Sequence, residues 1–296
     1  MSEFILATAS TCDLDRDWLD AHEIPFISYT FEIDGDVIAD DCRDKTKRKL
    51  YALMREGKAP NTSQINEYVY YRFFMELLQK GKPVLFADMD KAITGAYSNS
   101  LRAAETIKEE HPEYELYILD TRAITAGLGF LIKHMEALRE EGKTMQEVID
   151  WAEANKLRVV HRFMIDDLKW LRKGGRLSNA ASIAGTLLSL KPLVQLPDDG
   201  SLIAFEKPRG RKKAMRLLVE YIGKDIGDSF NKEMIVMHSD CPEDAQVLKE
   251  KILEAYPYLK SVEIMELGPV IAAHIGPDFL ATVYFSENNR GSYFKK

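Results

Sequence analysis

The first half of the chain alternates short apolar runs with amphipathic stretches of helical length. Apolar runs lie at residues 4–7, 83–87 and 116–120, and stretches with apolar positions three or four apart lie at residues 96–110 and 126–141. Strands that alternate with helices of this length are typical of a mostly parallel sheet with helices on both faces. We therefore predict an N-terminal α/β/α sandwich over residues 1–158.

The pattern changes after about residue 158, where short runs of strand length follow one another with fewer helices between them. Predicted strands lie at residues 193–196, 202–207, 234–238, 262–266, 269–274 and 280–285, and predicted helices at residues 179–189, 212–222 and 243–255. This order predicts a mixed or antiparallel α+β domain over residues 159–296. The whole chain is then a two-domain α/β protein.

Composition and charge narrow the class of protein. The chain has 296 residues, of which 46% are hydrophobic and 29% charged, and its net charge of −7 argues against a general nucleic-acid binder. Cys12, Cys42 and Cys241 lie far apart without C-x-x-C spacing, as expected for reduced thiols. No apolar run approaches the roughly 18 residues of a membrane span, and no signal-peptide layout is present. We expect a soluble cytoplasmic protein.

The sequence contains none of the common catalytic or cofactor motifs. A P-loop, zinc-ligand spacing, H-E-x-x-H and G-x-S-x-G are all absent. Gly127-Leu128-Gly129 lacks the third glycine of a dinucleotide fingerprint and lies inside a helical pattern, so we interpret it as a close-packing site. We expect no catalytic residue, no metal and no cofactor.

Three features have both a structural and a binding interpretation. Thr62 and Ser63 precede a predicted helix, where hydroxyls cap the helix or help to bind an anion, and the sequence alone favours the cap. His274 lies among apolar residues predicted to form a strand, and it suits a buried core or a ligand site equally well. Six of the ten residues from Lys207 to Arg216 are basic, which favours a docking surface for an anionic partner over a solvated face.

One longer stretch resembles the signature of the DegV family. That signature reads Asp-x-Leu-x-x-Leu-x-x-Gly-Gly-Arg-Ile/Leu-Ser, and Asp167-Leu168, Leu171 and Gly174-Gly175-Arg176-Leu177-Ser178 match it in order. Further segments that resemble the family's motifs lie at residues 8–14, 62–64, 94–97, 120–121, 126–129, 207–214, 268–271 and 273–277. Because the matches extend over nearly the whole chain, the sequence is identified as a member of this family.

The resemblance implies two α/β domains with a long-chain fatty acid in a tunnel between them. Burial of the acyl chain gains roughly 0.8 kcal/mol per methylene, so a long chain has on the order of ten kcal/mol available before binding costs. The positions that correspond to the family's carboxylate contacts are Thr62, Ser63, the loop from Asp90 to Thr94, and His274.

The resemblance also implies a partner. Some family members are the lipid-carrying subunit of bacterial fatty acid kinase, and they present the carboxylate to a separate ATP-using subunit. The arginines on the docking side correspond to Arg176, Arg209 and Arg211. A fatty acid or similar amphiphile is then the expected ligand, with no nucleic acid and no stable membrane insertion.

The loop at Asp90 departs from the family pattern. Where the family has Ser-Ser before Leu-Ser-Gly-Thr-Tyr, this chain has Asp90-Lys91 before Ala92-Ile93-Thr94-Gly95-Ala96-Tyr97. An aspartate about 4 Å from a fatty carboxylate would repel it by about 4 kcal/mol at an effective dielectric constant near 20. Either Lys91 compensates, or one carboxyl holds a proton, or Asp90 points away, or the head group is not a free carboxylate.

The sequence therefore favours a non-catalytic lipid-binding protein. Its expected head-group residues are Thr62, Ser63, Asp90, Lys91, Thr94 and His274. One alternative is an enzyme that acts on a different amphiphile, with Asp90 as acid or base in the cleft between the domains. Another is a sensor that binds lipid as an effector.

Overall fold

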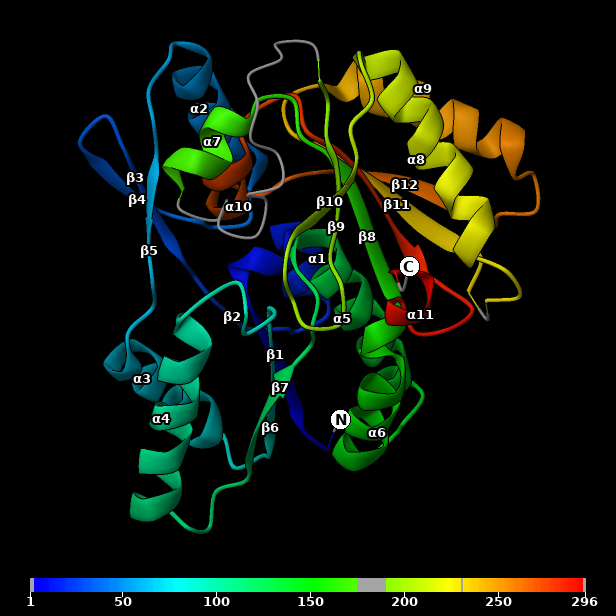
Figure 1. Ribbon diagram of the computed structural model, residues 1–296. Coiled ribbons are helices and arrows are strands. Elements are labelled where there is room, and N and C mark those ends of the chain that lie inside the picture. The colour runs from blue at the N-terminus through cyan, green and yellow to red at the C-terminus, as the bar shows by residue number, and fades with distance from the viewer. Residues whose placement is uncertain (1–2, 175–189, 230, 295–296) are drawn as a thin grey trace.

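The computed structural model describes residues 3–174, 190–229 and 231–294, and its first half is built on a parallel sheet. The strand order is β2-β1-β6-β7. The strands are β1 (Ile5–Ala9), β2 (Phe26–Ile27), β6 (Val84–Asp88) and β7 (Leu116–Asp120). Helices α3 (Glu67–Leu78) and α4 (Ala96–Glu110) lie on one side of this sheet, and α5 (Thr125–Glu140) and α6 (Met145–Asn155) on the other (Figure 1). The predicted parallel sandwich is confirmed.

The second half is built on a mixed sheet with the strand order β10-β9-β8-β13-β11-β12. Its pairs are antiparallel except for β11 with β12. The strands are β8 (Val159–Met164), β9 (Leu193–Gln195), β10 (Ile203–Glu206), β11 (Glu233–His238), β12 (Ser261–Glu266) and β13 (Leu280–Phe285). Helices α8 (Arg211–Asp225) and α9 (Pro242–Ala255) lie side by side next to it (Figure 1). The mixed sheet is as predicted, and the boundary at residue 158, just before β8, stays a prediction.

A small antiparallel sheet corrects the interpretation of Thr62 and Ser63. Its order is β4-β3-β5, and it consists of β3 (Thr30–Ile33), β4 (Asp36–Ala39) and β5 (Asn61–Ser63). The cap of α3 is instead Asn66, whose side chain accepts a hydrogen bond from the Val69 backbone N–H at 3.0 Å. The capping role favoured for Thr62 and Ser63 was therefore wrong.

The segment that follows β12 is a helix and not the predicted strand. Helix α10 (Pro269–Ile275) has Pro269 in its first turn, where the fixed φ of proline suits a helix and its missing N–H costs nothing. Gly276, with φ of 86°, ends the helix in a conformation that L-residues avoid. An apolar run of this length suits either structure, so periodicity alone could not separate the two.

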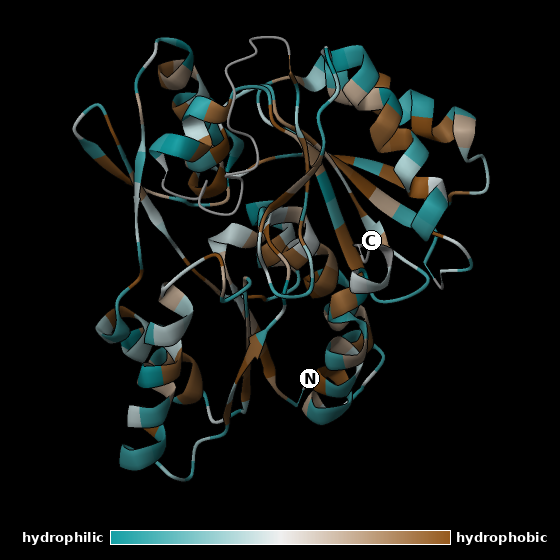
Figure 2. Ribbon diagram, viewed as in Figure 1, coloured by the Kyte–Doolittle hydropathy of each residue, from teal (hydrophilic) through white to brown (hydrophobic). Residues whose placement is uncertain are grey.

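The remaining described helices are short, apart from α2. They are η1 (Ser10–Cys12), α1 (Arg16–Ala21), α2 (Asp44–Arg55), η2 (Lys156–Arg158), α7 (Leu168–Lys173) and α11 (Gly291–Phe294). The helix expected over residues 179–189 lies outside the described residues. Figure 2 shows hydrophobic residues concentrated in the strands of the interior and hydrophilic residues on the outer turns of α4. Every helix in the described part of the chain is too short or too polar to cross a membrane.

Close packing explains the Gly127-Leu128-Gly129 segment of α5. A Cβ atom on Gly127 would lie 1.8 Å from Nε2 of His161, and one on Gly129 would lie 2.5 Å from the carbonyl oxygen of Cys12. Both distances are far below van der Waals contact. The interpretation of this segment as a packing site is confirmed.

Two arginines join the halves of the molecule. Arg55 of α2 bonds to the carboxylates of Asp240 and Asp278, at 2.6 Å in each case. Arg290, near the C-terminus, is fully buried and donates to the carbonyl oxygens of Arg122 and Val159 at 2.7 and 3.0 Å. The bonds of Arg55 and the bond from Arg290 to Arg122 hold the second half against the first.

Candidate functional site

Thr62 and His274 meet at the junction of the two halves. Thr62 lies on β5, opposite Phe31 of β3, and His274 lies in the last turn of α10. The Thr62 Oγ1 atom is 2.9 Å from Nε2 of His274, although the two residues are 212 positions apart in the sequence. The structure thus brings together two of the predicted head-group residues and leaves them half-buried.

A cavity of about 250 Å³ opens beside this pair. Its polar lining residues are Tyr29, Thr62, Ser63, Gln64, Thr94 and His274, and its apolar lining residues are Met89, Ile93, Ile124, Phe163, Leu171, Leu202, Val270, Ile271 and Ile275. Ser63 and Gln64 are exposed, whereas most of the apolar lining is buried. The cavity therefore has a polar mouth and an apolar interior, and both halves of the chain contribute to it.

The sequence of the chain matches a known protein family. Residues 4–287 match the family model described as "Uncharacterised protein, DegV family". A DegV domain-containing protein of Clostridium perfringens is 34% identical over 288 residues, which is 97% of this chain and 99% of that protein. The chain belongs to the DegV family.

Solved DegV structures share the whole architecture. A DegV family protein of Thermus thermophilus, described by its fatty acid binding, has a TM-score of 0.85 at 27% identity and covers 97% of this chain and 100% of its own. A fatty acid binding DegV family protein of Streptococcus agalactiae has a TM-score of 0.84 at 25% identity, with the same coverage. The two-domain α/β fold class expected from the sequence is therefore confirmed.

The first glycine of the DegV signature contacts the histidine of the site. A Cβ atom on Gly174 would lie 2.4 Å from Nδ1 of His274, so only glycine allows this approach. Its φ is −72°, so glycine is required here by the close approach to His274 and not by the backbone conformation. Trp170 of α7 packs in the same way against Gly276. Gly175 and Arg176 of the signature lie outside the described residues.

Two polar groups at the cavity have roles that the sequence did not fully indicate. Thr94 lines the cavity, and its Oγ1 accepts a hydrogen bond from the Ala96 backbone N–H at 3.1 Å. The Tyr29 hydroxyl is buried beside Thr94 and Tyr70, and it makes no well-directed hydrogen bond to any described residue. Burial raises the pKa of Tyr29, so its hydroxyl is a neutral donor at the cavity. The sequence analysis missed Tyr29 because an aromatic residue next to a predicted strand usually belongs to the hydrophobic core.

Asp90 and Lys91 are absent from the described lining of the cavity. The Asp90 carboxylate accepts from the Ala92 backbone N–H at 2.9 Å, and it lies so close to Gly200 that a Cβ there would be 2.5 Å from Oδ2. Burial raises the pKa of Asp90, and Asp120 acts in the same direction. Lys91 is exposed and lies 3.7 Å from Asp120. The carboxylate of Asp90 thus lies beside Gly200, and the choice among the four alternatives for this loop stays a prediction.

The arginines expected to dock a partner differ in their surroundings. Arg209 is exposed. Arg211 is engaged within the fold, since it pairs with Asp166 at 3.3 Å and with Asp244, and donates to the carbonyl oxygen of Asp278 at 2.6 Å. Arg211 therefore stabilises the second half, whatever else it contacts.

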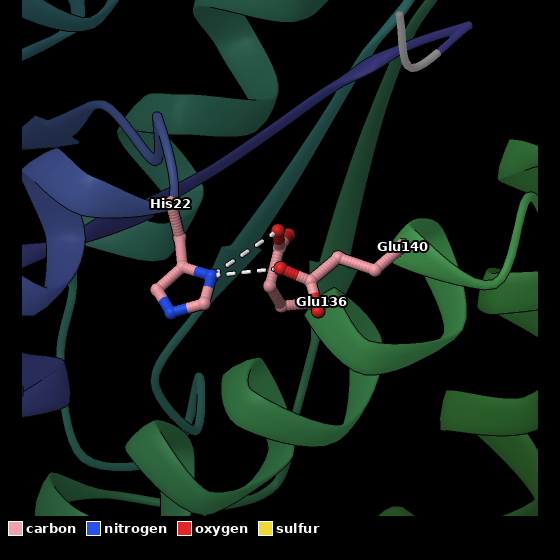
Figure 3. Close-up of side chains that lie close together, drawn as sticks. All are labelled: His22, Glu136 and Glu140. Carbon is pink, nitrogen blue, oxygen red and sulfur yellow. Dashed lines mark hydrogen bonds and ion pairs between the residues drawn. The ribbon is translucent and has the colours of Figure 1, made fainter.

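A second polar cluster lies away from the cavity. Nδ1 of His22 is 3.1 Å from Glu140 and 3.6 Å from Glu136, as Figure 3 shows. These are residue types that bind metal ions, and their ligand atoms lie within 4.8 Å of one another. However, Arg139 already pairs with both oxygens of Glu136, at 2.7 and 2.9 Å. We interpret the cluster as an ion-pair network that fixes α1 against α5.

Proposed function

We propose that this protein holds a long-chain fatty acid in the cavity and presents its head group to a partner. The observation that carries this proposal is the amphipathic cavity with the Thr62–His274 pair at its polar mouth. A hydroxyl and an imidazole suit a carboxylate, while the apolar interior suits an acyl chain. The Thermus thermophilus and Streptococcus agalactiae relatives, which are described as fatty acid binding, support the same ligand class.

In this proposal Thr62, Ser63, Thr94 and His274 hold the head group, and Tyr29 adds a further donor. Asp90 and Lys91 are not part of the head-group site, so the repulsion expected from Asp90 does not arise. The same placement leaves the alternative of an enzyme with Asp90 as its acid or base without support. The protein then acts as a carrier, performs no covalent chemistry itself and needs no cofactor.

The proposed partner is the catalytic subunit of a fatty acid kinase. Exposed basic side chains at Arg209, Lys212, Lys213 and Arg216 form a surface suited to an acidic partner. Exchange of Arg209 for alanine is then expected to lower the rate of acyl phosphorylation in the reconstituted pair without a change in fatty acid affinity. The free, buried cysteines suit a cytoplasmic location, which we also propose.

The first experiment is to denature the purified protein and identify the released molecules by mass spectrometry. The proposal requires a free fatty acid in near-stoichiometric amount. If the protein instead carried no lipid and bound none from a fatty acid mixture, the proposal would be wrong.

The second experiment tests the head-group assignment with two variants and two ligands. Thr62→Val and His274→Asn are each expected to weaken binding of a fatty acid by roughly tenfold to a hundredfold, because a hydrogen bond to a charged group contributes about 1.5–3 kcal/mol. Binding of the corresponding methyl ester should change much less, since it has no carboxylate. His111→Asn, far from the cavity lining, is the matched control. Equal losses for acid and ester would indicate damage to the cavity and would contradict the assignment.

A further inference from the structure

A second cleft, of about 600 Å³, lies between the two halves and is rich in charged groups. Four of its lining residues are buried or half-buried polar groups, namely Asp13 and Lys47 from the first half and His238 and Glu266 from the second. The lining also contains two further cations, Arg48 and Lys133, and three further carboxylates. None of the described residues that line this cleft lines the lipid cavity. The proposed lipid function does not use it.

Asp13 supplies a buried polar atom that has no partner among the residues that the structure describes. Its side chain lies in the cleft wall with only 3% of the residue exposed, and its backbone has φ of 57°. The carboxylate accepts a hydrogen bond from the Gly268 backbone N–H, at the start of α10. Its Oδ2 atom has no hydrogen-bond partner among the described residues. Buried polar groups are normally satisfied, so this atom indicates a missing partner at the cleft.

Lys47 supplies a buried ammonium group with unused donors. Only 6% of its side chain is exposed, and its ion pair within the described residues is to Asp44, at 3.7 Å, which is beyond hydrogen-bond range. An ammonium has three N–H donors and needs acceptors when it is buried. Lys47 lines the same cleft as Asp13, Glu266 and His238.

His238 and Glu266 complete the set with a donor and an acceptor. Nδ1 of His238 accepts from the Cys241 backbone N–H at 3.4 Å, so Nε2 carries the proton of the neutral ring. Burial lowers the pKa of His238 and keeps it neutral. Glu266 ends β12 and makes no ion pair within the described part of the chain. Burial raises the pKa of Glu266, because a carboxylate that has lost part of its solvent is less stable when charged.

These groups define the ligand by its charge. A purely anionic molecule would meet the carboxylate of Glu266, and a purely cationic one would meet the ammonium of Lys47. We propose that the cleft binds a small zwitterion of the α-amino acid class, with its carboxylate on Lys47 and His238 and its ammonium on Glu266 and Asp13. The volume of the cleft lies within the range of pockets that bind small molecules, and Leu14, Trp18 and Met265 in its wall offer apolar contact to a side chain.

The probes for a test are the standard L-amino acids, each added to the full-length protein in a thermal-shift screen. Each amino acid that raises the melting temperature is then measured by calorimetry beside its deaminated acid and its decarboxylated amine. At least one amino acid is expected to bind at least tenfold more tightly than both of its analogues. If no amino acid binds, or if an analogue binds equally well, the proposal is overturned.

Variants of two cleft residues test whether the amino acid binds in this cleft. Lys47→Met and Glu266→Gln are each expected to weaken binding by roughly tenfold to a hundredfold, as expected for the loss of a hydrogen bond to a charged group. Lys49→Met is the matched control, because Lys49 is an exposed residue of the same helix that pairs with Asp36 at 3.0 Å. Glu266→Gln keeps the test valid if Lys47→Met fails to fold. Affinity that is unchanged in the folded variants would mean that ligand binding occurs elsewhere.

Discussion

Replacement of Gly174 by alanine tests how the signature segment positions the site. The new Cβ atom would lie 2.4 Å from Nδ1 of His274, whereas an ordinary contact is at least about 3.4 Å. The imidazole must therefore move by about 1 Å. The hydrogen bond between His274 and Thr62, now 2.9 Å, cannot keep its geometry after such a shift.

The expected result separates binding from stability. Because φ of Gly174 is −72°, alanine fits the backbone there, and the free energy of unfolding should fall by about 1–3 kcal/mol, the usual cost of overpacking, which leaves the protein folded. Fatty acid affinity, in contrast, should fall by roughly tenfold to a hundredfold, since the carboxylate loses a positioned donor. Affinity is measured by displacement of a fluorescent fatty acid analogue, and stability by urea unfolding.

Arg172→Ala is the control, because Arg172 is an exposed residue of the same helix. If Gly174→Ala bound fatty acid as tightly as the wild type, the contact between Gly174 and His274 would have no part in binding. If both variants lost affinity equally, the effect would belong to α7 as a whole. Either result would refute the reasoning.

Three further predictions follow from groups outside the cavity. Asp90→Asn should change fatty acid affinity by less than about threefold, because the carboxylate faces Gly200, and a tenfold change in a binding assay would contradict its placement. Burial raises the pKa of Asp13 from 3.8 to about 8, so the native state binds this proton more tightly than the unfolded state. Its contribution to stability is complete below about pH 4 and is lost as the pH rises towards 8, at up to roughly 1.4 kcal/mol per pH unit. Urea unfolding of Asp13→Asn should therefore show a flatter decline over this range, and an unchanged slope would exclude Asp13 as its source. Arg211→Met should lower the free energy of unfolding by about 2 kcal/mol or more, because Asp244 loses its cation and the carbonyl oxygen of Asp278 loses its donor, whereas Arg209→Met should change it by less than about 0.5 kcal/mol. Equal unfolding midpoints for these two variants would contradict this distinction.

The sequence predicted the regular parts of the fold well. Buried parallel strands such as β1 and β6 are continuous apolar runs between polar loops, and α5 has an unmistakable helical period. Helix α10 was missed because its seven residues are too few for a period to show, although Pro269 after Gly268 is a helix-start signal. The strand β5 was missed because it has only three residues and is made by pairing with β3.

The site depended on information that local patterns do not contain. Thr62 and His274 are brought together by tertiary packing, and family resemblance was the only feature of the sequence that linked them. Tyr29 gave no signal, because its position at the cavity depends on residues far along the chain. The direction of Asp90 could not be inferred either, since it follows from contact with Gly200, more than a hundred residues away.

The arginine contacts between the halves also determine how a ligand reaches the cavity. To swing the halves apart, the molecule must break the paired bonds of Arg55, each contributing about 0.2–1 kcal/mol, and the bond from Arg290 to the Arg122 carbonyl oxygen, which contributes about 1.5–3 kcal/mol. A path past the exposed Ser63 and Gln64 breaks none of them. We therefore expect the ligand to enter and leave through local movement of the segment at Ser63 and Gln64, without a hinge motion of the two halves. The rate of ligand exchange should then depend on this segment.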